Sequence, residues 1–217
     1  RDYAVTGVQT CALPICDVIR NLSGMWQILF KDKYVKYFDV PQNYDDSIGG
    51  EFYVREMQVM REDLGKLRGK PITDDELHAS IAVYNDNRRA LRDLYAYRSA
   101  KPWQAPTSEV YLVLRAGCVL PPEEHTNLVR DYIAAADAEK RAVRDNARVV
   151  LTGAFCEQPP LSLIKSIEMA GCYIVDDDFM LVMRWLLDDV PSAGDPLQEL
   201  SKAFLHRSAS TDRKSVV

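Results

Sequence analysis

The final third of the chain alternates between short apolar runs and longer amphipathic runs, and this pattern restricts the possible folds more than any other feature. Two apolar runs, RVVLTGAF at residues 148–155 and CYIVDD at residues 172–177, have the length and composition of buried strands. Each is followed by a stretch with helical spacing of its apolar residues, over residues 159–170 and 179–190. Strands that alternate with helices in this way pair in parallel through right-handed crossovers. The sequence therefore predicts an α/β fold with a parallel sheet.

The preceding part of the chain is predicted to be mostly helical. Its strongest signal is the capping-box sequence Thr73-Asp74-Asp75-Glu76, after which apolar residues keep a helical period to about Ser99. Further helices are predicted over residues 16–30, 48–67, 107–115, 121–142 and 195–205. We expect the hydroxyl groups of Thr107 and Ser108 to cap one of these helices. The aromatic and β-branched run at residues 34–40 instead predicts a buried strand.

The predicted elements suggest three native segments. Residues 16–47 would be the end of one Rossmann-like α/β domain, residues 48–146 a helical segment, and residues 147–211 the start of a second Rossmann-like domain with a parallel sheet. The two ends of the chain look foreign to this plan. Residues 1–15 resemble a translated sequencing-library adapter, and residues 212–217 resemble the opposite adapter. We therefore expect both ends to be non-native and the native part to be an internal fragment of a longer protein.

Charge, hydropathy and cysteine content exclude several classes of protein. The formal net charge of -5, with no basic stripe, argues against a nucleic-acid partner, since duplex binding depends on clustered Lys and Arg. No uncharged apolar run approaches the roughly 20 residues that a membrane-spanning helix needs. The five cysteines are irregularly spaced, which is atypical of a disulfide framework and favours a reducing compartment. We expect a cytoplasmic protein without a membrane partner.

Candidate site residues follow the two predicted strands, because ligands of such sheets bind at the carboxyl ends of the strands. Cys156 could be a thiolate or metal ligand, or equally a small buried residue before a Pro-Pro turn. The aspartates at residues 176–178 could bind a metal or act in acid/base chemistry, but a solvated helix start is the favoured interpretation. Cys118 and Cys172 are expected in the core. The three histidines (His78, His125 and His206) are expected at the surface, and catalytic residues stay unassigned.

Several long collinear stretches carry a resemblance to a known family. They are CDVIRNLSGMW at residues 16–26, YFDVPQN at 37–43, IGG at 48–50, YNDNRR at 84–89, residues 110–117, GAFCEQPP at 153–160, and residues 171–178. Together they make residues 16–208 similar to the 2-hydroxyacyl-CoA dehydratase and benzoyl-CoA reductase family, most of all to its C (gamma) type of subunit.

The resemblance implies an iron–sulfur protein. Each of two related subunits in this family holds a cluster on three cysteines, and Cys16 matches the second ligand of a [4Fe–4S] cluster. The first ligand would precede residue 16 and the third would follow residue 211, so the fragment itself is expected neither to hold the cluster nor to be active. Cys156 and Asp176 are possible lining residues of the cluster cleft.

The implied activity is single-electron reduction of an aromatic acyl-CoA, with an acyl-CoA thioester as the substrate. The implied partners are a homologous B-type subunit and an ATP-hydrolysing iron–sulfur activator. Two alternatives stay open: a subunit of a 2-hydroxyacyl-CoA dehydratase, and a non-catalytic partner subunit of the same complex that relays electrons or stabilises the heterodimer.

Overall fold

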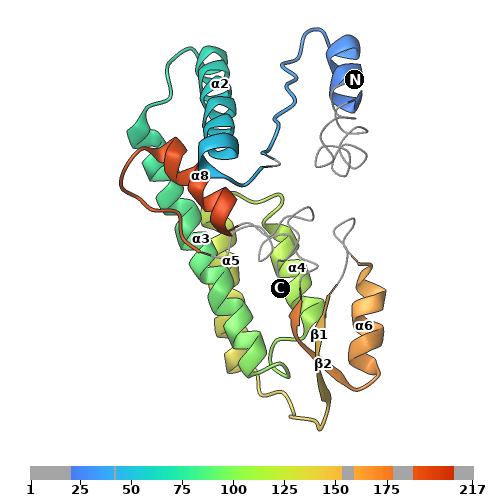
Figure 1. The fold of residues 1–217 in the computed structure, drawn as a ribbon. Helices are drawn as coiled ribbons and strands as arrows, with labels where there is room; N and C mark the ends of the chain where they lie inside the picture. The colour runs from blue at the N-terminus through green and yellow to red at the C-terminus, as the bar shows by residue number, and fades with distance from the viewer. Residues whose placement is uncertain (1–20, 42, 153–158, 178–187, 208–217) are drawn as a thin grey trace. The chain divides into compact units, whose positions relative to one another are not determined.

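The computed structural model describes residues 21–41, 43–152, 159–177 and 188–207 (Figure 1). The chain divides into two compact units, the first ending at Ile72 and the second beginning at Thr73. No helix among these residues is both long and apolar enough to cross a membrane.

The first unit contains two helical segments joined by an extended connection. Its described part begins in a helix that runs to residue 29, and a π-helical turn, η2 (Asp46–Gly50), leads into α2 (Glu51–Arg68). The turn requires glycine at Gly49, because a Cβ atom there would lie 1.6 Å from the backbone oxygen of Asn43. Helix α2 confirms the helix predicted in this region.

The strand predicted at residues 34–40 is wrong. These residues are extended, but no segment among the described residues pairs with them in a sheet. Their aromatic side chains contact α2 instead: the Tyr34 hydroxyl donates to Asp63 at 3.0 Å, and the ring centroids of Phe38 and Tyr53 are 5.6 Å apart. Aromatic content thus reflects packing on a helix here, since strand propensity depends on a partner strand.

Five of the helices predicted in the second unit are present in the predicted order, and most of the helix predicted at residues 179–190 lies outside the described residues. The five helices are α3 (Asp74–Ala100), α4 (Thr107–Ala116), α5 (Pro122–Ala138), α6 (Leu161–Met169) and α8 (Pro196–Arg207). The predicted capping box at the start of α3 is present: the Glu76 amide donates to the Thr73 hydroxyl at 3.2 Å, and the Thr73 amide donates to the Glu76 carboxylate at 2.9 Å. Asp195 caps α8 by accepting from two backbone amides.

Helix α5 ends four residues before the predicted boundary, and the Gln104 side chain explains why. Its amide nitrogen donates to the backbone oxygen of Ala136 at 3.0 Å and to that of Glu139. Its oxygen accepts from the amide of Arg141 at 3.0 Å. These contacts replace the helical hydrogen bonds and turn the chain toward the sheet.

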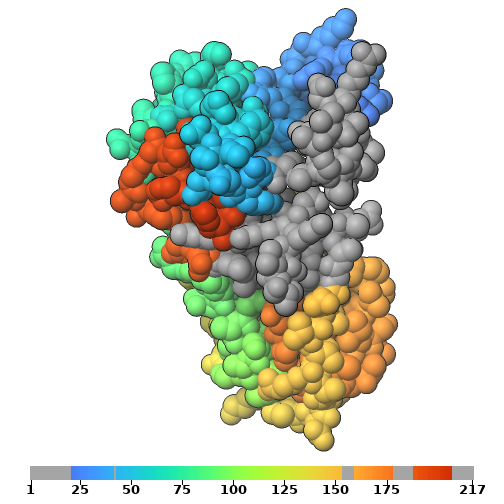
Figure 2. Space-filling model, in the orientation of Figure 1, coloured from blue at the N-terminus to red at the C-terminus, as the bar shows by residue number. Residues whose placement is uncertain are grey.

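The sheet consists of two parallel strands, β1 (Ala147–Leu151) and β2 (Cys172–Asp177), connected through α6. Ala147 is opposite Cys172, and an irregularity between Val149 and Val150 shifts the register so that Leu151 is opposite Asp177. This confirms the predicted α/β class and the parallel pairing. Figure 2 shows α6 on the surface of this unit, beside the segment that leads into β1.

Helices α3 and α5 lie side by side, and α3 also packs on β2 (Figure 1). The fully buried residues of this core include Leu94, Val110, Leu114, Val129, Ile164 and Ile174.

The predicted cap at the start of α4 is wrong: Pro106 is the N-cap, and the Thr107 hydroxyl donates to the backbone oxygen of Ile174 at 3.1 Å. Thr107 therefore joins α4 to β2 instead of closing its own helix.

Candidate functional site

The carboxyl end of β2 carries two adjacent aspartates in different environments. The Asp177 side chain is 2% exposed, whereas that of Asp176 is 62% exposed. Successive side chains of a strand point to opposite faces of the sheet, so one carboxylate enters the core and the other faces solvent. The expectation of a solvated helix start is therefore wrong for Asp177, although Asp176 is exposed as that interpretation required. Asp178 and Cys156 lie outside the described residues.

Arg98 of α3 neutralises the buried aspartate. Its side chain has no exposed surface, and its Nη1 atom lies 2.6 Å from Asp177 Oδ2. The same nitrogen donates to the Thr107 hydroxyl at 3.4 Å, and the Tyr95 hydroxyl donates to Asp177 Oδ1 at 3.4 Å. The guanidinium carbon lies 4.5 Å from the centre of the Tyr95 ring. The arrangement joins α3, α4 and β2 through one charged network.

The network keeps the tyrosine protonated. Burial raises the pKa of Tyr95 far above its ordinary value, and the negative charge of Asp177 raises it further. The hydroxyl therefore stays a hydrogen-bond donor to the carboxylate over the physiological range. Arg98 Nε and Nη2 have no hydrogen-bond partner among the described residues, and Nη2 lies 3.8 Å from Asp176 Oδ1. The charge of Arg98 thus faces both aspartates at the end of β2.

Arg98 was not predicted from the sequence, although a signal was present. It follows Leu91, Leu94 and Tyr95 at helical spacing, on the face of α3 that enters the core. A charged residue on an apolar face needs a buried partner of opposite charge. Asp177, the last residue of a predicted buried strand, is such a partner.

Helix α3 also binds the chain beyond this edge, through the YNDNRR stretch that carried the family resemblance. Asn85 exchanges two hydrogen bonds with the backbone of Val190, at 2.7 Å and 2.9 Å. Arg89 and Arg92 lie 2.8 Å and 2.7 Å from the carboxylate of Asp189. One helix therefore fixes both Asp177 and the segment at residues 189 and 190.

His125 is buried, contrary to the surface position expected for all three histidines. Its side chain lies between α4 and α5, with Nε2 3.0 Å from the Val113 backbone oxygen and Nδ1 3.1 Å from the Asn87 side-chain nitrogen. A Cβ atom at Gly117 would lie 2.5 Å from its ring. Since both ring nitrogens are engaged by neutral groups, His125 is a structural residue.

The described cysteines do not converge. Cys118 is exposed after α4, which corrects the expectation of a core position, and Cys172 is partly buried at the start of β2. Cys16 lies outside the described residues. No group of three metal-ligating side chains occurs within residues 21–41, 43–152, 159–177 and 188–207. The described residues alone therefore do not supply the ligands of an iron–sulfur cluster.

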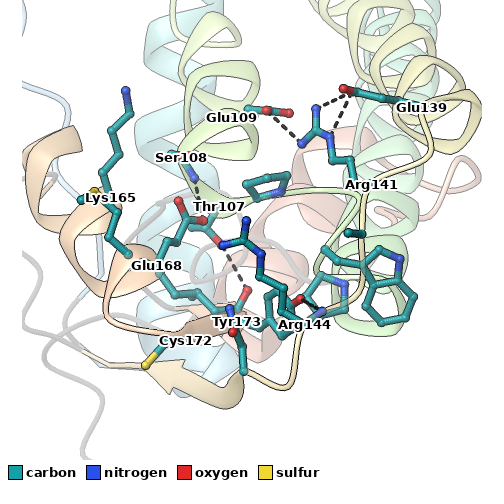
Figure 3. Close-up of a pocket in the computed structure, with 17 residues that line it drawn as sticks. Thr107, Ser108, Glu109, Glu139, Arg141, Arg144, Lys165, Glu168, Cys172 and Tyr173 are labelled. Atoms are coloured by element: carbon teal, nitrogen blue, oxygen red, sulfur yellow. Dashed lines mark hydrogen bonds and ion pairs between the residues drawn. The ribbon is translucent and has the colours of Figure 1, made fainter.

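A pocket of about 630 Å³ lies at the opposite, amino edge of β2 (Figure 3). The start of α4, the segment before β1, the end of α6 and the first residues of β2 form its walls. Neither Asp176 nor Asp177 lines it. The carboxyl edge and this pocket are therefore two separate features of the second unit.

The parallel β1–α6–β2 arrangement, held by α3, defines the chain as an α/β protein. The chain matches the sequence model of the family described as 2-hydroxyglutaryl-CoA dehydratase, D-component, over residues 5–215. The chain therefore belongs to that family. The family resemblance noted from the sequence motifs is thereby confirmed.

Three relatives illustrate the range of the family. The chain is 59% identical over 200 residues to the C subunit of benzoyl-CoA reductase of Thauera aromatica, covering 92% of this chain and 52% of the relative. It is 30% identical over 203 residues to the beta subunit of lactoyl-CoA dehydratase of Anaerotignum propionicum, covering 92% and 53%. It is 28% identical over 209 residues to the beta subunit of (R)-2-hydroxyglutaryl-CoA dehydratase of Acidaminococcus fermentans, covering 94% and 54%. The chain thus spans about half the length of the curated relatives it matches.

Proposed function

We propose that the chain is part of an iron–sulfur subunit of an ATP-dependent aromatic acyl-CoA reductase of the benzoyl-CoA type. The observation that carries this proposal is the difference in identity: 59% to a benzoyl-CoA reductase subunit, against 30% and 28% to two dehydratase subunits. The parent enzyme would reduce a CoA thioester by single electrons.

In this proposal Cys16 supplies one thiolate of a [4Fe–4S] cluster, and two further cysteines come from parts of the native protein outside residues 16–211. Thiolates suit such clusters because soft, anionic sulfur stabilises the iron. When bound, the cluster would supply the electron at low potential. The 217-residue chain by itself would be inactive, because it lacks two of the three ligands.

The partners proposed for the parent are a homologous B-type subunit, an ATP-hydrolysing iron–sulfur activator and the acyl-CoA substrate. Within this chain, the Arg98–Asp177 pair would fix the carboxyl edge of the sheet against α3. Asp176, exposed at that edge, would line the cleft together with Cys156. Both roles are positional and need no cluster ligand among the described residues.

A second candidate is a subunit of a 2-hydroxyacyl-CoA dehydratase, in which the same type of complex removes water from the thioester substrate. The matched family is described by a dehydratase, and two of the three relatives are dehydratase subunits. A third candidate is a non-catalytic subunit. Such a subunit would relay electrons to the B-type partner or stabilise the complex with it.

The test uses the complete native gene, recovered from the same DNA source and produced without oxygen together with its B-type partner and activator. We expect ATP-dependent reduction of benzoyl-CoA and a cluster signal in electron paramagnetic resonance that Cys16→Ser removes. Dehydration of 2-hydroxyacyl-CoA without benzoyl-CoA reduction would instead establish the second candidate. Full activity in Cys16→Ser would overturn the proposed cluster ligand.

A further inference from the structure

The pocket at the amino edge of β2 lies far from the carboxyl edge proposed to take part in the reaction. Cys172, Tyr173 and Ile174 open β2 and line the pocket, whereas Asp177 ends the strand. At about 3.3 Å per residue, the six-residue strand separates the two edges by roughly 17 to 20 Å. A ligand in the pocket therefore occupies a site of its own.

One wall of the pocket is aromatic. The ring centroids of Trp103 and Tyr173 are 6.5 Å apart at an interplanar angle of 61°. The Tyr173 hydroxyl accepts a hydrogen bond from the backbone amide of Arg144 at 2.8 Å, which fixes the ring against the segment before β1. Trp103 is half-buried, so part of its indole stays open to the pocket. Such surfaces bind flat aromatic rings by offset or edge contacts.

The carboxylates that line the pocket are all engaged. Glu109 and Glu139 both pair with Arg141, at 2.9 Å and 2.6 Å (Figure 3). Glu168 accepts from the backbone amide of Ser108 at 3.3 Å, at the positive end of α4. Glu109 and Glu139 therefore share one cation, and Glu168 is held by a backbone amide and not by an ion pair.

Two cations that line the pocket lack such partners. Arg144 comes from the segment before β1 and Lys165 from α6 (Figure 3). Among the described residues, neither side chain makes an ion pair or a hydrogen bond. The pocket thus combines an aromatic surface with two cations from different elements that form no ion pair among the described residues.

We propose that this pocket binds a phosphorylated nucleoside, with its base against Trp103 and Tyr173 and its phosphates between Arg144 and Lys165. The volume of about 630 Å³ lies within the range of small-ligand sites. Two cations on separate elements match a ligand with more than one negative charge, and a guanidinium is well suited to phosphate. The same chemistry occurs in free ADP and in the nucleotide end of coenzyme A.

The experiment titrates the 217-residue chain with ADP, coenzyme A, adenosine, inorganic phosphate and benzoate, using isothermal calorimetry. We expect ADP and coenzyme A to bind and the three smaller probes to bind at least about tenfold more weakly, since each lacks either the ring or the second charge. Tighter binding of coenzyme A than of ADP would identify its nucleotide end as the ligand, and the reverse order would identify free nucleotide. Benzoate binding as tightly as ADP would overturn the proposal.

Variants locate the site. Arg144→Ala combined with Lys165→Ala should weaken ADP binding by about tenfold or more, while the matched control Arg130→Ala, an exposed cation on α5, should leave it unchanged. Trp103→Phe should weaken ADP and adenosine by a similar factor. Thermal unfolding checks that each variant is folded. Absent ADP and coenzyme A binding, or binding unaffected by the double variant, would refute the pocket assignment without touching the proposed reductase function, because the readout is binding alone.

Discussion

Arg98 and Asp177 form a buried charge pair, and such pairs respond asymmetrically to mutation. The two side chains are 0% and 2% exposed. Both charges lose hydration on folding, and their attraction offsets this cost only while both are present. The tyrosine and threonine hydroxyls that contact the pair satisfy some of its remaining hydrogen-bonding groups.

We predict that Arg98→Met lowers the free energy of unfolding by about 3 kcal/mol or more, because it leaves the Asp177 carboxylate buried and unpaired. Urea denaturation followed by circular dichroism measures the change. The control is Arg130→Ala, which removes a solvent-exposed pair with Asp86 and should change the stability far less than Arg98→Met does. Equal effects of the two variants would contradict the prediction.

Asp189 gives a pH-dependent prediction. Burial raises the pKa of its carboxyl group, but hydrogen bonds and charges from Arg92 and Arg89 outweigh burial and hold the pKa below its ordinary value. A lowered carboxyl pKa adds stability above the unfolded value of about 3.9, and this stability is lost as the pH falls through the folded pKa. The Asp189–arginine contribution should therefore be full at neutral pH.

We accordingly predict that Asp189→Asn is less stable than the unmodified chain at pH 7, and that the difference shrinks below about pH 4. Urea denaturation at several pH values measures it. Asp145→Asn, in the segment before β1, serves as the comparison variant. A difference for Asp189→Asn that stays constant down to pH 3 would show that the arginine contacts do not carry the effect.

At the scale of elements, local signals predicted what local interactions determine. The capping box set the start of α3, and Asp195 set the start of α8, because the capping groups lie within three residues of the amides they bind. The end of α5 depends on Gln104, more than 30 residues earlier in the chain. Distant partners of this kind leave no periodic pattern in the sequence.

The residues of the candidate site likewise fall into those that local sequence patterns located and those whose positions depend on distant partners. Asp176 was placed at the strand end from the alternation of strands and helices alone. The burial of Asp177 and the role of Arg98 could not be derived without knowing that α3 covers β2. His125 was misplaced for the same reason, since its partners Asn87 and Val113 belong to two other helices. Sequence patterns located the edge of the sheet, and only the packing showed which side chains enter the core.

Two glycines of the first unit should respond to alanine with opposite signs. At Gly49 a Cβ atom would overlap the Asn43 backbone, so Gly49→Ala should destabilise the first unit by about 3 kcal/mol or more. Gly24 lies within a helix, and a Cβ atom added there would meet no other atom within 4 Å, so Gly24→Ala should stabilise by about 0.5 to 1 kcal/mol. Chemical denaturation of both variants measures the signs. Tolerance of alanine at Gly49 would show that the close approach of Asn43 is not required.

At the scale of the whole molecule, the proposed foreign origin of the ends makes a simple prediction. Residues 1–15 and 212–217 would not have been selected to pack against the rest of the chain. Deleting both should change the melting temperature by no more than about 2 °C, which corresponds to about 0.5 to 1 kcal/mol for a chain of this size. Differential scanning calorimetry of the shortened and full chains provides the measurement. A large loss of stability would instead show that these residues belong to the fold.

The two-stranded sheet has a further consequence for how this chain behaves at high concentration. Within the described residues, β1 and β2 pair only with each other, so one edge of β1 bonds to no other strand, whereas the Thr107 hydroxyl binds the Ile174 oxygen of β2. Val150 of β1, 59% exposed, adds an apolar side chain at this small sheet. Open strand edges recruit strands from other molecules. The chain should therefore self-associate by adding strands between copies, and light scattering that rises with protein concentration, together with growing β-sheet content, would report it.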